Sequence, residues 1–213
     1  MTKDININDL KYRNTKNEDT ILREIADGYL GRERDMTQLG LSEKLGISIS
    51  IVNKIVRKLY DISAVRIDRR SFSVISFERL MMYGATHRSI RKDITYSIHT
   101  DMKISEIESS MPSGIAFTAF SGYKSLYKES PADYSEVYAY PTETALDIIK
   151  ERFGISRGSP NIIMLEADPF LQKKIRDEGL RVAPSPQIFV DLWNINTWYA
   201  KEFVDRMEER LFG

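Results

Sequence analysis

Residues 41–59, LSEKLGISISIVNKIVRKL, decide how the N-terminal third of the chain folds. The second half of this stretch, residues 49–60, repeats apolar side chains at the three- and four-residue steps of a helix with one buried face. Gly46 stands where the chain must turn sharply between two crossed helices. The pattern therefore predicts a helix, a corner and a second helix. The predicted buried stripe consists of Val52, Ile55, Val56 and Leu59.

The opposite face of the second predicted helix is polar at its start and cationic further along. The residues on this face are Ser48, Ser50, Asn53, Lys54, Arg57 and Lys58. A helix in the DNA major groove presents its first turns to base edges, where Asn53 could pair with adenine and Lys54 with guanine. Arg57 and Lys58 would meet phosphate oxygens, which supply affinity and register rather than sequence choice.

A predicted β-hairpin follows this helix. The runs AVRID (64–68) and RSFSVIS (70–76) are rich in strand-forming residues and flank a tight turn. Arg69 and Arg70 occupy the tip, and Arg66 lies nearby, where a wing would flank a groove. Upstream, residues 17–30 have helical periodicity, RERDMTQ reads as a polar connector, and residues 1–16 read as a loosely ordered arm.

The order helix, helix, turn, helix, hairpin over residues 17–76 resembles the winged helix-turn-helix domains of bacterial and archaeal transcription regulators. The resemblance implies double-stranded DNA as the partner. Its candidate contacts are the six residues on the helix face and the three hairpin arginines. The alternative is a helical packing unit with a solvated basic face, because charged helix faces are often only solvated. Winged-helix units also serve as protein-docking modules without DNA.

Composition and charge fit a protein that binds a polyanion with one half of its chain. The 213 residues carry 31 basic and 31 acidic side chains, but residues 44–92 hold 11 basic and 3 acidic ones. The chain has no cysteine and two histidines without metal-ligand spacing, so we expect neither metal nor cofactor. No apolar run is long enough for a membrane span, and the start lacks a secretory signal. Cytoplasmic residence is the expectation.

The second part of the chain, residues 77–213, alternates predicted strands with predicted helices, so the expected fold class is α+β with a C-terminal α/β domain. Strands are predicted at 94–98, in GIAFTAFSG (114–122), in EVYAY (136–140) and in NIIMLEA (161–167). Helices are predicted at 77–86, 104–111, 142–153, from Asp168-Pro169 to Gly179, from Ser185-Pro186 onward, and at 197–211. Segment 77–111 has no assigned role.

Nucleotidyltransferases use a strand, a Gly-Ser turn that holds phosphate, and a later pair of carboxylates that holds Mg²⁺. Here Ser121-Gly122 could supply the turn. Asp133 and Glu136 lie three apart, so on a strand they would point to opposite faces. A lone carboxylate fixes a metal poorly. We therefore expect a nucleotidyltransferase-like domain that is not an enzyme, and an active nucleotidyltransferase is the alternative.

The segments GIAFTAFSGYKSLY, EVYAY, VAPSPQIFVDLWN and AKEFVDRM resemble the C-terminal domain of the AbiEi family of type IV toxin–antitoxin antitoxins and related archaeal regulators. That resemblance implies a minimal nucleotidyltransferase fold behind a winged helix, and an autorepressor that can counter a partner toxin. A free-standing regulator without a toxin fits equally well. Gln187 and Asp191 recur in the family motif. As neighbours on one helical face, they are expected to cap the helix and form a structural hydrogen bond, with ligand binding as the alternative.

Two further groups of residues leave their roles open. Trp193, Trp198 and Tyr199 are expected in a core or a dimer interface, with base or ligand binding as the alternative. His87, Arg88, Arg91 and Lys92 would either extend a phosphate-binding surface or form a solvated connector. Taken together, the sequence predicts a cytoplasmic, sequence-specific DNA-binding regulator. A homodimer is expected, because two half-sites multiply modest affinities.

Overall fold

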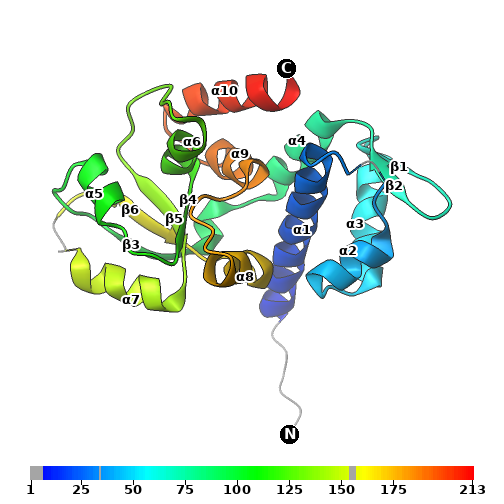
Figure 1. The fold of residues 1–213 in the computed structure, drawn as a ribbon, viewed down its shortest axis with the longest axis horizontal. Coiled ribbons are helices and arrows are strands. Elements are labelled where there is room, and N and C mark those ends of the chain that lie inside the picture. The colour runs from blue at the N-terminus through cyan, green and yellow to red at the C-terminus, as the bar shows by residue number, and fades with distance from the viewer. Residues whose placement is uncertain (1–6, 34, 154–156) are drawn as a thin grey trace, which may run out of the picture. The chain divides into compact units, whose positions relative to one another are not determined.

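The computed structural model describes residues 7–33, 35–153 and 157–213, and it divides the chain into two compact units (Figure 1). The first unit is Met1–His87 and the second is Arg88–Gly213. In the described residues, no helix combines the length and apolar character needed to cross a membrane.

The first unit contains the predicted order of elements. Its elements are α1 (Ile7–Leu30), α2 (Gln38–Leu45), α3 (Ile49–Asp61), β1 (Val65–Ile67), β2 (Phe72–Val74) and α4 (Phe77–His87). Helix α1 begins at Ile7 rather than at residue 17, so the prediction of a loosely ordered arm is wrong for residues 7–16. Residues 1–6 of that predicted arm lie outside the described residues.

Helices α2 and α3 meet as the apolar stripe predicts. Val52, Val56 and Leu59 have no exposed surface, and Ile55 is 2% exposed. Leu41 of α2 is also buried. Gly46 ends α2 at φ +64°, the left-handed conformation that favours glycine after a helix. An added Cβ at Gly46 would meet no atom within 4 Å, so backbone conformation rather than crowding favours glycine there.

Strands β1 and β2 form the predicted antiparallel hairpin, with Val65 opposite Val74 and Ile67 opposite Phe72. The segment expected to be a polar connector takes part in this hairpin. Met36 is buried and exchanges two backbone hydrogen bonds with Phe72, at 3.0 and 2.8 Å. The connector therefore adds a bridging residue to the small sheet, and its buried side chain explains why it is not a free loop.

The connector also starts α2 earlier than expected. The Thr37 hydroxyl accepts a hydrogen bond from the Gly40 amide at 2.9 Å, which satisfies a free N–H of the first helical turn. Gln38 is consequently the first residue of α2 rather than part of a connector.

Helix α4 belongs to the first unit, so the boundary falls after His87 rather than after residue 76. Its first residue, Phe77, stacks on Tyr29 of α1 with ring centroids 4.7 Å apart. One turn before its end, the Tyr83 hydroxyl donates to Glu18 of α1 at 2.7 Å. These contacts give α4, within the unassigned segment 77–111, a packing role against α1.

The second unit is built around a four-stranded sheet with the strand order β3-β6-β5-β4. Strands β5 and β6 run parallel, whereas the β3–β6 and β4–β5 pairs are antiparallel. The strands are β3 (Ile94–Ile98), β4 (Ile115–Thr118), β5 (Val137–Pro141) and β6 (Ile162–Leu165). The helices are η1 (Ile90–Asp93), α5 (Ile104–Ser110), α6 (Ala119–Tyr127), α7 (Glu143–Arg152), α8 (Pro169–Asp177), α9 (Ser185–Trp193) and α10 (Ala200–Phe212). The class is α+β.

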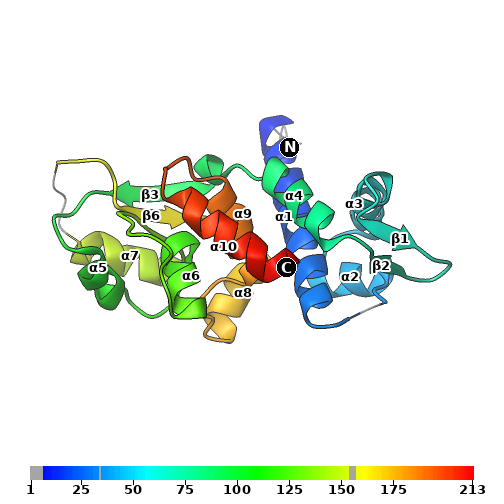
Figure 2. The same cartoon turned by 90° about the horizontal axis from the view of Figure 1, so that it is seen from above.

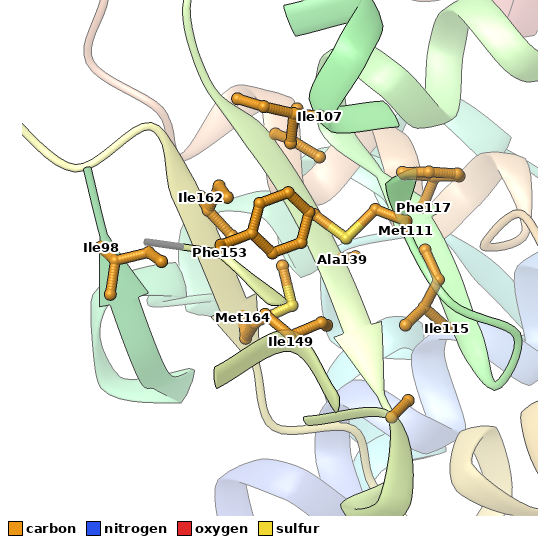
Figure 3. Close-up of a cluster of buried hydrophobic side chains, with 12 residues drawn as sticks. Ile98, Ile107, Met111, Ile115, Phe117, Ala139, Ile149, Phe153, Ile162 and Met164 are labelled. Carbon is orange, nitrogen blue, oxygen red and sulfur yellow. The ribbon is translucent and has the colours of Figure 1, made fainter. Parts of the chain in front are cut away.

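One face of this sheet carries an apolar core (Figure 3). Ile107 of α5 and Ile149 of α7 pack against Ala139 of β5 and Met164 of β6 in this cluster. The alternation along β5 places Tyr138 and Tyr140 on the other face. Figure 2 shows α9 and α10 side by side.

Three local predictions in the second unit are wrong in detail. The run GIAFTAFSG turns at Ala119, which has φ +48°, and Ser121-Gly122 lies inside α6 rather than in a turn. Helix α9 has Pro184 rather than Ser185 at its cap position. Asp168 does cap α8, accepting from the amides of Phe170 and Leu171 at 3.0 and 3.1 Å. Gly154, which directly follows the helix predicted at 142–153, lies outside the described residues.

Candidate functional site

The outer face of α3 begins with two exposed serines. Ser48 stands at the cap position without a side-chain capping bond, and its hydroxyl lies 3.1 Å from that of Ser50. Lys54 and Arg57 follow on the same helix and are both exposed. Four of the predicted contact residues are therefore accessible on one helix whose opposite stripe is fully buried.

Asn53 lies between these residues in a chain of hydrogen bonds. Its Nδ2 donates to Gln38 Oε1 at 2.8 Å, and its Oδ1 accepts from Arg57 Nε at 3.0 Å. Asn53 is half-buried, so these bonds fix the orientation of its amide. Gln38 is not among the residues predicted for this surface. The signal was Thr37, because a threonine just before an apolar-periodic run marks a helix start and places the next residue on the first turn.

Lys58, unlike the exposed Lys54, forms an ion pair within the first unit. Its Nζ lies 2.8 and 3.0 Å from the two carboxylate oxygens of Glu18, which also accepts from the Tyr83 hydroxyl. Burial alone would raise the pKa of Glu18, but the hydrogen bonds from Lys58 and Tyr83 outweigh it, so the pKa lies below its usual range. Lys58 therefore ties α3 to α1, whereas the sequence predicts a phosphate contact for it.

The hairpin tip carries the remaining predicted cations. Arg66 Nε lies 3.2 Å from Asp68 Oδ2, and both side chains are largely exposed. Arg69 and Arg70 are exposed between β1 and β2, where Figures 1 and 2 show the connecting loop projecting from the unit. Within the described part of the chain, neither Arg69 nor Arg70 forms an ion pair.

The cations of the first unit thus divide into two groups. Lys58 and Arg66 have carboxylate partners, at Glu18 and Asp68. The group without an ion pair among the described residues consists of Lys54, Arg57, Arg69 and Arg70. Cations without a carboxylate partner can bind phosphate without first breaking an ion pair, so this second group is the more favourable one for a polyanion.

The second unit does not assemble the predicted phosphate turn. Ser121 is 1% exposed in the first turn of α6. Asp133 is exposed in the loop before β5, and Glu136 accepts a hydrogen bond from the Tyr199 hydroxyl. In the described residues, no group of three or more His, Asp or Glu side chains has the arrangement of a metal site.

A buried polar cluster of the second unit is centred on Arg88. Its Nη1 lies 2.5 Å from Asp93 Oδ2, its Nε donates to Asp191 Oδ1 at 2.9 Å, and its Nη2 donates to the Tyr140 hydroxyl at 2.8 Å. Arg88 is 7% exposed and Asp191 is fully buried. The prediction of either a phosphate-binding surface or a solvated connector is therefore wrong for Arg88, although Arg91 and Lys92 are exposed.

Three more donors complete the shell around Asp191. Thr118 Oγ1 and the Tyr140 hydroxyl both donate to Oδ2 at 2.6 Å, and Gln187 Nε2 donates to Oδ1 at 3.0 Å. The Gln187–Asp191 hydrogen bond confirms the structural interpretation of this pair. Burial raises the pKa of Tyr140 well above its usual value despite the nearby Arg88 guanidinium. The cluster joins η1, β4, β5 and α9.

The three aromatic residues near the C-terminus separate. Tyr199 is 8% exposed, but Trp193 is 41% and Trp198 is 78% exposed. Of the two expected positions, the core is confirmed for Tyr199. Both tryptophans lie outside the core of the described chain, so for them a dimer interface stays a prediction.

No family model matches the chain, and neither the curated proteins nor the solved structures contain a match to it.

Proposed function

We propose that the protein is a sequence-specific DNA-binding transcriptional regulator whose first unit is a winged helix-turn-helix domain. The observation that carries the proposal is the two-sided character of α3. Val52, Val56 and Leu59 are fully buried on one side, while Lys54 and Arg57 are exposed on the other. A recognition helix needs this combination of a fixed position and an accessible cationic face.

In this proposal, the start of α3 approaches base edges in the major groove. Lys54 donates to the O6 and N7 of a guanine, and Ser48 and Ser50 contact bases or phosphates. Asn53 reaches adenine from an orientation set by Gln38 and Arg57. Ile49, which is 49% exposed at the first position of α3, suits the methyl group of a thymine.

The hairpin acts as the wing. Arg69 and Arg70 contact phosphate oxygens. Arg66 also contacts phosphate, after its ion pair with Asp68 breaks. Arg57 also contacts phosphate. Lys58 contributes less than the sequence alone suggests, because its bond to Glu18 would have to break before it could reach DNA. These contacts would supply affinity and orientation, while the base contacts of α3 select the site.

We propose that the second unit is a nucleotidyltransferase-like domain that serves interaction or sensing, in a cytoplasmic homodimer. The β4–α6 connection, a strand leading directly into a helix that carries Ser121 and Gly122 in its first turn, supports this interpretation. If the chain is an antitoxin-type autorepressor, this unit is where a partner toxin would bind. Glu136, the carboxylate that an active nucleotidyltransferase would use for a metal, accepts a hydrogen bond from the Tyr199 hydroxyl in the described structure.

The test is binding of the full chain to DNA from its own promoter region, measured by fluorescence anisotropy over a range of salt concentrations. The double variant Arg57→Ala/Arg70→Ala should bind more weakly, and the slope of log K against log salt should fall by about 2, because each lost phosphate contact removes about 0.9. The Lys54→Ala variant should relax base preference at one position of the site, where we expect discrimination of about 1–3 kcal/mol.

A matched control separates site contacts from net charge. Lys173→Ala/Arg206→Ala removes two exposed cations of the second unit and should leave affinity and salt slope unchanged. Equal slopes for both double variants would contradict the α3 interface. A wild-type chain that ignores DNA at about physiological salt but retains a protein partner would instead be a docking module.

A further inference from the structure

The second unit has a cavity of about 550 Å³ at the carboxyl ends of the parallel strands β5 and β6. Both strands lead from this end into a helix, β5 into α7 and β6 into α8 (Figure 1). Ligands of open α/β sheets bind outside the carboxyl ends of parallel strands, because the connections leave a crevice there. The volume is within the usual range for small-molecule sites, about 300–1,000 Å³.

The walls of this cavity are held by the protein's own hydrogen bonds. Thr142 caps α7 by accepting from the Ala145 amide at 3.3 Å. Asp168 caps α8, and Gln172 Nε2 of α8 donates to the carbonyl of Pro141 at the end of β5 at 2.8 Å. A ligand would therefore enter a site whose two helices are already fixed to the sheet, so little ordering cost opposes binding.

The lining combines both signs of charge with an apolar surface. Glu143 and Glu166 are exposed acids, and Arg176 is an exposed base. The Glu143 carboxylate forms no ion pair with another described residue. Arg176 uses its Nε for Asp177 at 2.8 Å, which leaves its terminal N–H groups as donors. The apolar lining consists of Pro141, Leu146, Leu165 and Ala167, and the remaining lining residues are Thr95, Thr142, Thr144 and Gln172.

This arrangement selects by charge. Two carboxylates and one guanidinium disfavour phosphates and other free anions, and they favour a ligand with an ammonium group and a carboxylate. The partly exposed side chain of Leu146 suits a short aliphatic portion of such a ligand.

We propose that this cavity binds a free aliphatic amino acid. Its ammonium group would lie against Glu143 and Glu166, its carboxylate would accept hydrogen bonds from Arg176, and its side chain would contact Leu146, which is only partly buried. The proposal does not depend on DNA binding by the first unit, since all lining residues belong to the second unit.

Isothermal titration calorimetry of the full chain with leucine, isoleucine, valine and methionine tests the proposal. At least one of them should bind with a Kd of about 1 mM or below. For a leucine-binding protein, 4-methylpentanoate lacks the ammonium group and 3-methylbutylamine lacks the carboxylate, and both should bind at least about tenfold more weakly. For isoleucine, valine and methionine, the analogues that lack the ammonium group or the carboxylate are the corresponding controls.

Two variants connect binding to the cavity. Glu143→Gln removes the acid that forms no ion pair among the described residues, and it should weaken binding of the amino acid at least about tenfold. Glu151→Gln, on the exposed side of the same helix, should leave affinity unchanged. Absence of saturable binding by all four amino acids would overturn the proposal. Equal binding of the analogues, or equal effects of the two variants, would overturn it as well.

Discussion

Replacement of Asp191 by alanine tests the cluster that joins four elements of the second unit. The carboxylate accepts four hydrogen bonds, from Arg88, Gln187, Thr118 and Tyr140, at 2.6 to 3.0 Å. All four donors are buried, so water cannot replace the lost acceptor without opening the structure. The Arg88 guanidinium would lose one carboxylate partner and keep the one at Asp93.

The expected loss of unfolding free energy is about 3–5 kcal/mol, the usual cost of removing one partner from a buried ion pair. With a urea m-value of about 2 kcal/mol/M, this loss lowers the midpoint of unfolding by about 1.5–2.5 M. Asp191→Asn should cost less, because the amide keeps one oxygen as an acceptor.

Tryptophan fluorescence measures this unit selectively. The chain has two tryptophans, Trp193 and Trp198, and both lie in the second unit. Trp193 is the last residue of α9, the helix that carries Asp191, so its emission reports the loss of local structure. Urea titration with excitation of tryptophan therefore follows the second unit without a signal from the first.

Asp205→Ala is the matched control. It removes an aspartate of the same unit whose ion pair with Lys201 is exposed to solvent, and exposed pairs contribute about 1 kcal/mol or less. In a double-mutant cycle, Arg88→Met and Asp191→Ala together should cost less than the sum of the single changes, because the two groups interact. If Asp191→Ala and Asp205→Ala shifted the midpoint equally, the reasoning about burial would be wrong.

Three further predictions concern the first unit. Burial raises the pKa of Glu18, but the hydrogen bonds from Lys58 and Tyr83 lower it overall, so the folded-state pKa lies below that of the unfolded chain. The ionised Glu18 carboxylate therefore contributes its full stabilisation above the unfolded-state pKa, and this contribution is lost as the pH falls through the folded-state pKa. Glu18→Gln should therefore flatten the acid limb of hydrogen-exchange protection in α1, and an unchanged limb would contradict this. Gly46→Ala should cost about 1–2 kcal/mol by forcing alanine into the left-handed region, with a smaller loss for Gly46→Asn, as measured by amide exchange in α2 and α3. Lys58→Met should lower amide-exchange protection in α2 and α3 strongly and DNA affinity only slightly, whereas Lys54→Met should lower DNA affinity strongly and protection only slightly. Equal effects of the two variants on both measurements would contradict the assignment of Lys58 to packing and Lys54 to DNA binding.

The sequence predicts those parts of the fold whose signals are local. The stripe through Val52, Ile55 and Leu59 and the glycine at position 46 specify α2, the corner and α3, because helical period and left-handed conformation depend on neighbouring residues. The Asp168-Pro169 start of α8 is predictable for the same reason. Its capping bonds join residues two and three apart.

Other features depend on tertiary packing and leave little local signal. The turn after β4 is at Ala119, and alanine is not favoured at φ +48°, so the Ser121-Gly122 pair gave a misleading turn signal. The buried Arg88 pairs with Asp191, which is 103 positions away. From a single sequence, an arginine is expected on the surface, because a buried arginine needs a charged partner and the sequence does not show which residue the fold brings next to it.

The candidate DNA contacts divide in the same way. Exposure of Lys54 and Arg57 follows from the helical period and was predictable. The bond from Lys58 to Glu18 was not, since it joins residues 40 positions apart on different helices.

The strand arrangement of the second unit also bears on self-association. The outer edge of β4 is covered, because Phe117 exchanges backbone hydrogen bonds with Arg181 and Ala183 at 2.9 and 2.8 Å. The other edge is β3, five residues long, where the register shifts between Ile94 and Tyr96. A short, irregular border is a poor template for the backbone of another molecule. Concentrated solutions of this chain should therefore resist fibril growth through sheet extension.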